Sequence, residues 1–169
     1  MPYSDNSNTE WMRWLLEQLQ PQSIIDIGAG AGKYGQLSKE ILPGCHTTAV
    51  EIWAPYAIQF GLDKIYDRVD ICDARIYPFQ EVDLVIMGDV LEHMTKEDAL
   101  ALWERISKVA KNAVISIPIV HYPQDEYEGN PYEIHIEDHW THEKVLESFA
   151  GITGFQVFPV VGCYAAKFK

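Results

Sequence analysis

The chain has 169 residues, of which 47% are hydrophobic and 22% charged, a composition typical of one globular domain. Its 25 acidic and 13 basic residues give a formal net charge of −12, and such a surface repels the phosphates through which nucleic acids are bound. No apolar run approaches the roughly 20 residues of a membrane span, and the first residues do not resemble a signal peptide. We therefore expect one cytoplasmic domain over residues 1–169 that does not act on nucleic acid, and no pattern indicates an oligomeric state.

Apolar periodicity predicts that strands and helices alternate through the first two thirds of the chain. Ser7-Asn8-Thr9-Glu10 has the form of a capping box, so a helix is expected within residues 1–21. Further strands are expected at 23–27, 46–50, 68–71, 82–87 and 113–117, and further helices at 33–41, 55–60 and, capped by Thr95, 96–109. This alternation predicts a parallel sheet covered by helices on both faces.

The last third of the chain departs from this alternation. Residues 118–140 have no clean periodicity, yet they are too rich in histidine and aromatic residues for disorder. A helix capped by Thr141 is expected to reach about Ala150, followed by β-rich segments at 155–161 and 164–168 that are joined at Gly162-Cys163. The predicted fold is therefore a three-layer α/β sandwich, with a seven-stranded, mostly parallel, Rossmann-like sheet that ends in an antiparallel hairpin.

A glycine-rich turn follows the first strand and invites two nucleotide-binding interpretations. The P-loop is rejected, because the position five residues before Gly32 is Ile27 and the residue after Lys33 is Tyr34. The dinucleotide pattern Gly-x-Gly-x-x-Gly is satisfied by glycines 30, 32 and 35, and Glu51 follows at about the distance of a ribose partner. This second pattern predicts an NAD(P)-dependent oxidoreductase of Rossmann type.

A third interpretation comes from a family resemblance. Asp26-Ile27-Gly28-Ala29-Gly30-Ala31-Gly32 resembles the Asp/Glu-x-Gly-x-Gly-x-Gly signature of class I S-adenosylmethionine (SAM)-dependent methyltransferases, and Cys72-Asp73-Ala74 resembles the acidic motif after their third strand. Val82 to His93, which ends in Val-Leu-Glu-His, resembles the fourth-strand signature of the subgroup that includes ubiquinone-biosynthesis O-methyltransferases. From Ile24 to Lys169 the chain is similar to a small member of this family. It departs from many relatives at residues 109–113, where they have Pro-Gly-Gly.

The resemblance implies a SAM site at the carboxyl ends of the strands, with S-adenosylhomocysteine (SAH) as product. Glu51 would accept hydrogen bonds from both ribose hydroxyls, and Asp73 would accept one from the adenine amino group. The complete set of implied cofactor residues is Asp26, Gly28, Ala29, Gly30, Gly32, Glu51, Ile52, Asp73, Ala74, Gly88 and Asp89.

SAM carries an activated methyl group, so the protein mainly has to align an acceptor with the leaving sulfur. A hydroxyl acceptor must also lose a proton, and histidine titrates near neutrality. The candidate bases are His93, His121, His135 and His139, of which three lie in the 118–140 loop that we expect to form the acceptor side. We predict methyl transfer to a small polar molecule, with O-methylation preferred over N-methylation.

Two alternatives remain for the acceptor side and for the activity. Asp89, Glu92 and His93 would bind a divalent metal if Glu137, His135 or His139 completed the shell, and some ubiquinone-type relatives depend on magnesium. The oxidoreductase interpretation lacks a second domain for its substrate and leaves Asp73 and the Val-Leu-Glu-His segment unexplained. A noncatalytic SAM-binding module is the remaining possibility.

Overall fold

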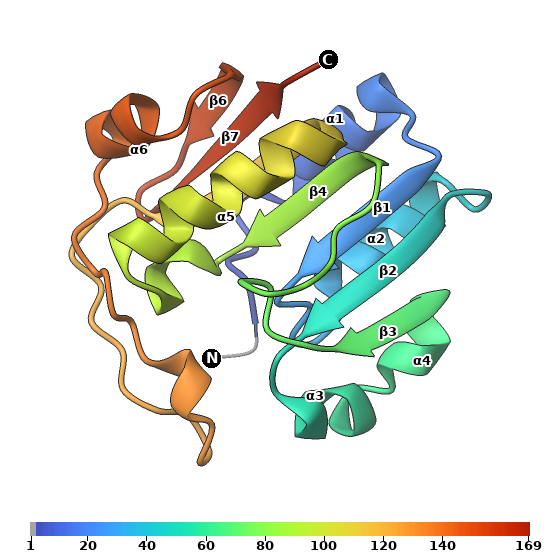
Figure 1. Cartoon of the computed structure of the whole chain (residues 1–169), viewed down its shortest axis with the longest axis horizontal. Helices are drawn as coiled ribbons and strands as arrows, with labels where there is room; N and C mark the ends of the chain where they lie inside the picture. The colour runs from blue at the N-terminus through green and yellow to red at the C-terminus, as the bar shows by residue number, and fades with distance from the viewer. Residues whose placement is uncertain (1–2) are drawn as a thin grey trace.

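The computed structural model describes residues 3–169 and contains one seven-stranded sheet (Figure 1). The strands lie in the order β3-β2-β1-β4-β5-β7-β6; β1 to β5 are parallel to one another, and β7 is antiparallel to both β5 and β6. This confirms the predicted fold class. The bounds are β1 Ser23–Ile27, β2 His46–Glu51, β3 Arg68–Ile71, β4 Val82–Gly88, β5 Ala110–Pro118, β6 Ile152–Val157 and β7 Val161–Lys167.

Helices cover both faces of the sheet because its central strands are apolar on both sides. On β4, Leu84 and Ile86 pack with α1 and α2, while Val85 and Met87 pack with α5 and α6 on the opposite face (Figure 1). Within residues 3–169, no helix is long and apolar enough to cross a membrane. The helices are α1 Thr9–Leu19, α2 Lys33–Ile41, α3 Ala54–Gln59, α4 Leu62–Ile65, α5 Lys96–Val109 and α6 His142–Ser148, with short 3₁₀ helices η1 Leu91–His93 and η2 Pro131–Glu133.

Two of the three predicted helix caps are present. The hydroxyls of Thr95 and Thr141 accept hydrogen bonds from backbone N–H groups at the starts of α5 and α6. The capping box at Ser7 was wrong, because Asn8 is the N-cap residue of α1 and its side chain makes no cap hydrogen bond. Asn8 is instead fully buried and donates to the hydroxyls of Tyr34 (3.1 Å) and Ser116 (3.0 Å), so a tertiary contact replaces the local one.

Two connections also differ from the sequence expectation. The hairpin turn lies at residues 158–160 and not at Gly162-Cys163, which are inside β7. Gly162 is needed there for packing, since an added Cβ would lie 2.7 Å from Cε2 of Tyr164. The helix α5 ends at Val109 and β5 begins at Ala110, so the segment that lacks Pro-Gly-Gly contains no separate loop.

The carboxyl ends of β1, β2 and β4 meet at one edge of the sheet, and two irregular segments cross that edge (Figure 1). The N-terminal segment reaches it through the N–H of Asp5, which donates to the Asp89 carboxylate at 3.1 Å. The 118–140 loop reaches it through the N–H groups of Ile136 and Glu137, which both donate to the carbonyl of Glu92. The edge that carries the predicted cofactor residues is therefore covered by both segments.

We predict that Gly35→Ala destabilises the protein by about 1–3 kcal/mol, the usual range for overpacking a filled core. An added Cβ would lie 2.7 Å from the Tyr66 hydroxyl oxygen, which accepts from the Gly35 N–H and donates to Asp26. The ring therefore cannot move without losing both bonds. Urea denaturation would measure the change, with Gly154→Ala as the control because nothing in the described structure lies within 4 Å of that added Cβ. Equal effects of the two variants would contradict this packing argument.

Candidate active site

A cavity that is partly open to solvent lies at the carboxyl ends of β1, β2 and β4. Three of the predicted cofactor residues, Asp26, Ala29 and Gly32, do not line it. The others contribute to the lining itself: Gly28, Gly30, Glu51, Ile52, Asp73, Ala74, Gly88 and Asp89.

The turn after β1 depends on glycine for its backbone and for its packing. Gly28, Gly30 and Gly32 have φ values of +67°, +49° and +80°, the left-handed region that side chains rarely adopt. A Cβ on Gly28 would lie 2.6 Å from Cγ2 of Val90, and one on Gly32 would lie 2.6 Å from Cδ1 of Ile65. Gly28 and Gly30 bring bare backbone to the cavity wall, whereas Gly32 serves the start of α2.

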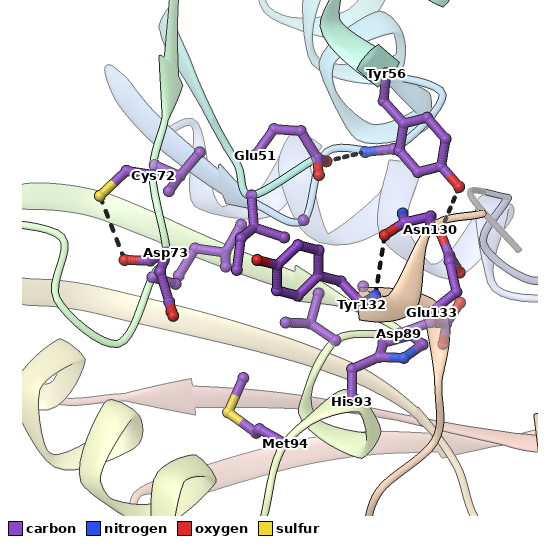
Figure 2. Close-up of a pocket in the computed structure, with 18 of the residues that line it drawn as sticks. Glu51, Tyr56, Cys72, Asp73, Asp89, His93, Met94, Asn130, Tyr132 and Glu133 are labelled. Atoms are coloured by element: carbon purple, nitrogen blue, oxygen red, sulfur yellow. Dashed lines mark hydrogen bonds between the residues drawn. The ribbon is translucent and has the colours of Figure 1, made fainter. Parts of the chain in front are cut away.

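Glu51 holds the turn against the end of β2. Its Oε2 accepts from the N–H of Gly30 at 3.0 Å, and its Oε1 accepts from the N–H of Trp53 at 2.8 Å. Figure 2 shows the Glu51 side chain at the wall of the cavity. The side chain is buried, which raises the pKa of the carboxyl, although these two N–H groups favour the charged form and oppose that shift. Each oxygen keeps a second acceptor position, so the carboxylate is fixed in place and able to accept from a pair of hydroxyls.

Asp73 is held charged at the far end of the cavity by Arg75. The guanidinium Nη2 lies 2.7 Å from Oδ2 of Asp73, and the Arg75 N–H donates to Oδ1 at 2.8 Å. Hydrogen bonds from this side chain lower the pKa of Asp73, against the opposing effect of partial burial. Ala74, which is buried beside it, provides apolar surface to the same wall.

Asp26 supports the turn from behind. It is buried within β1 and accepts a hydrogen bond from the hydroxyl of Tyr66, which is in turn bonded to the N–H of Gly35. Burial raises the pKa of Asp26 to about 7, helped by the nearby charge of Glu51 and opposed by the bond from Tyr66. The structure therefore places Asp26 where it positions the glycine turn and not on the cavity wall.

Asp89 follows β4 with a φ of +56° and connects the sheet to the N-terminal segment. Its Oδ1 accepts from the Ser116 hydroxyl at 3.1 Å, and its Oδ2 accepts from the N–H of Asp5 at 3.1 Å. Lys33 donates from Nζ to Asn8 Oδ1 at 2.6 Å and to the carbonyl of Asp5. Burial raises the pKa of Asp89. The N-terminal segment is thereby fastened over the end of β4.

A second cavity adjoins the first, and Asp89 and His93 line both. Glu92 and His135 line the second cavity only. Glu92 is 1% exposed, and neither of its carboxyl oxygens has a hydrogen-bond partner in residues 3–169. Burial, reinforced by the charge of Asp89, raises the pKa of this carboxyl well above its usual range.

His93 and His135 face each other across this cavity, with ring centroids 4.8 Å apart. Nδ1 of His93 lies 3.2 Å from the carbonyl oxygen of Ile134, and Nδ1 of His135 contacts that of Tyr122. A carbonyl only accepts, so each Nδ1 carries the proton and each Nε2 keeps its lone pair. Burial, followed by the neighbouring His135, lowers the pKa of His93 to about 4.

The other two candidate bases lie outside both cavities. The side chains of His121 and His139 are 59% and 65% exposed, and both contact the carboxylate of Asp138. Their ring centroids are 4.6 Å apart. The structure thus separates the four histidines into a cavity pair, His93 and His135, and a surface pair, His121 and His139.

Sequence reasoning missed the contribution of η2 to the first cavity. Tyr132 projects into it between Glu51 and His93 (Figure 2). Its N–H donates to Asn130 Oδ1 at 3.0 Å, and the hydroxyl of Tyr56 donates to Glu133 at 2.9 Å. The Asn130 cap followed by Pro131 is a local signal for η2, whereas the bond from Tyr56 joins residues 77 apart in the sequence, which no local pattern indicates.

Neither a protein-family model nor a curated protein matches the sequence significantly. Solved structures do match the fold. The N-terminal domain of EvdMO1 with SAH bound has a TM-score of 0.72 at 12% identity, over 98% of this chain and 83% of that one. The 1,6-didemethyltoxoflavin-N1-methyltransferase of Burkholderia thailandensis, bound to 1,6-didemethyltoxoflavin and SAH, has a TM-score of 0.67 at 19% identity, over 98% and 80%.

Human N-acetylserotonin methyltransferase, in complex with SAM, has a TM-score of 0.64 at 20% identity, over 95% of this chain but only 51% of the human one. The chain likewise spans 54% of the length of the mitomycin 7-O-methyltransferase MmcR. The fold is therefore that of the class I SAM-dependent methyltransferases, as the motifs predicted.

We predict that Asp26 makes the protein less stable as pH rises. Its pKa is about 7 in the folded state and about 4 in an unfolded chain, so between these values the folded state binds more protons. The free energy of unfolding then falls with pH, and this group's contribution drops by roughly 2–3 kcal/mol from pH 5 to pH 8. Urea denaturation of the wild type and Asp26→Asn at both pH values isolates this contribution. Parallel pH dependence of the two proteins would contradict it.

Proposed function

We propose that the protein is a SAM-dependent methyltransferase that acts on a small polar molecule, by O-methylation in preference to N-methylation. The observation that carries this proposal is the pair of adjoining cavities that share Asp89 and His93. The first has a glycine backbone wall and a fixed Glu51 carboxylate, and the second is rich in groups that accept protons. A donor in one and an acceptor in the other would meet at the shared residues.

The residues of the first cavity fit SAM, which supplies a methyl group already activated on sulfonium. Glu51 would bind the two ribose hydroxyls, because both of its oxygens are held in place by backbone N–H groups. Asp73 would accept from the adenine amino group beside Ala74. The carboxylates of this wall also complement the positive charge of the donor. With the donor held by these residues, the acceptor has to lie in line with the leaving sulfur.

The second cavity favours an acceptor that carries a hydroxyl. We propose that the cavity pair, His93 and His135, orients it, because each Nε2 can accept a hydrogen bond from an O–H group. A divalent metal is the alternative for the same groups, because it would take both Nε2 lone pairs and because the buried carboxyl of Glu92 has no partner within the part of the chain that the structure describes. Such a metal would lower the pKa of an acceptor hydroxyl.

The oxidoreductase alternative has less support. The third glycine of the dinucleotide pattern, Gly35, lies inside α2 against the ring of Tyr66, and this packing explains why a side chain is excluded there. The pattern therefore does not require a pyrophosphate. A thermal-shift comparison separates the two activities: SAH at 100 times its dissociation constant should add about 2.7 kcal/mol of stability, and NAD none.

Stabilisation by NAD alone would overturn the proposal. Turnover is tested with methyl-labelled SAM against a panel of phenols, sugar alcohols and amines. Label transfer to a hydroxyl compound supports the proposed reaction, whereas SAH binding without transfer to any member of the panel would favour a noncatalytic SAM-binding module.

We predict that Glu51→Gln weakens SAH binding by about 10- to 100-fold, since hydrogen bonds to a charged group contribute roughly 1.5–3 kcal/mol. The amide keeps the size of the side chain but presents an N–H group where the carboxylate accepts from backbone N–H groups. Isothermal titration calorimetry would measure the loss, with circular dichroism to verify the fold. Asp63→Asn, which neutralises an exposed acid at the start of α4, is the matched control. Equal affinity of Glu51→Gln and wild type would exclude this role.

A further inference from the structure

The carboxyl group of Glu92 stands out because it is buried without compensation. Its side chain lies in η1 at 1% exposure, and both oxygens lack a hydrogen-bond partner among residues 3–169. Burying a polar group without a hydrogen-bond partner is unfavourable, and more so when the group is charged. A partner that the polypeptide does not supply would remove this cost.

Two imidazoles stand beside this carboxyl. One ligand atom each from Glu92, His93 and His135 lies within 4.8 Å of the other two, so a single ion can reach all three. The two histidines are partly buried, and the group lines the second cavity. The site therefore combines a buried carboxylate with two nitrogen donors and remains accessible from the cavity.

The surroundings prepare both histidines to act as ligands. Each Nδ1–H donates to a backbone carbonyl, of Ile134 for His93 and of Tyr122 for His135. Metal-binding histidines usually donate their other ring N–H in this way, which fixes the tautomer and the ring orientation. The loop that carries His135 is bonded to the carbonyl of Glu92 through two backbone N–H groups, at 2.8 and 3.0 Å. The three side chains are thus held together before any ligand arrives.

We propose that Glu92, His93 and His135 bind one divalent transition-metal ion in the acceptor cavity. Two imidazoles and one carboxylate suit zinc, manganese, iron or cobalt, whereas magnesium and calcium prefer oxygen ligands. Three protein ligands leave further coordination positions open towards the cavity. The catalytic role of the ion rests on the proposed methyl transfer: once held by the two Nε2 atoms and Glu92, the ion, in place of the imidazoles, would lower the pKa of an acceptor hydroxyl.

The surface pair of histidines provides a competing site that any experiment must separate. His121, Asp138 and His139 also have ligand atoms within 4.8 Å of one another. His121 and His139 are exposed to water, and both already contact the carboxylate of Asp138. Within residues 3–169, no buried group at this surface site therefore lacks a partner. We therefore expect the cavity site to bind a metal ion more tightly than the surface site.

Cobalt(II) is the probe, because its visible absorption reports coordination by nitrogen ligands. Zinc is then used to displace it in a competition titration.

We expect the wild type to bind one cobalt ion tightly and Glu92→Gln to bind it at least tenfold more weakly. The double variant His121→Ala/His139→Ala should bind it with unchanged affinity. Absence of tight binding in the wild type, wild-type affinity in Glu92→Gln, or loss of the tight site in the double variant would each overturn the proposal.

Thermal unfolding gives an independent readout with the same proteins. In the presence of a chelator, Glu92→Gln should melt at the same temperature as the wild type or higher, because the uncompensated acid is gone. With saturating zinc the order should reverse. SAH binding, measured alongside, distinguishes the two proposals: normal SAH affinity without metal binding refutes the metal site alone, whereas metal binding without SAH binding refutes the methyltransferase.

Discussion

The two backbone hydrogen bonds of Glu51 are the constraint on which the site depends. β1 lies between β2 and β4, and the N–H of Gly28 donates to the carbonyl of Val50 at 2.8 Å, so the turn starts in a fixed register. The bonds from Gly30 and Trp53 to the Glu51 carboxylate then fix how the turn continues. A buried acid is costly unless it is hydrogen-bonded. Here the same contacts stabilise the acid and shape the wall of the cavity.

Packing behind the turn explains why an apparent dinucleotide pattern exists in a methyltransferase fold. The ring of Tyr66 lies against Gly35, and its hydroxyl joins the first turn of α2 to Asp26 in β1. Gly32 similarly makes room for Ile65. Two of the three glycines in the pattern are thus accounted for by side chains of the protein itself. Glycine spacing alone is a weak indicator of a ligand, because a closely packed side chain, like a ligand, requires a residue without Cβ.

The sequence predicted those parts of the structure that local chemistry decides. The apolar runs located β1 and β4, and threonine caps located the starts of α5 and α6. The predicted cofactor residues at the strand ends could be grouped from the sequence because parallel strands end at one edge. Asn8 escaped prediction because its buried partners lie 26 and 108 residues away. The pairing of His93 with His135, and the entry of Tyr132 into the cavity, depend on the path of the 118–140 loop, which has no periodicity to read.

The segment from Gly88 to His93 brings the proposed donor side and the proposed acceptor side together in one short piece of chain. Gly88 and Asp89 line the first cavity where β4 ends, and within one 3₁₀ turn Glu92 and His93 reach the second. The proposed methyl transfer requires the reacting atoms to approach within about 3–3.5 Å in line, so small relative movements of the two cavities would slow it. β4 is central in the sheet, and η1 follows it almost directly, so a rigid strand sets the separation of the two cavities. The 118–140 loop adds His135 to this fixed segment through its bonds to the Glu92 carbonyl, so that the loop contributes to the proposed acceptor side while the strand keeps the alignment.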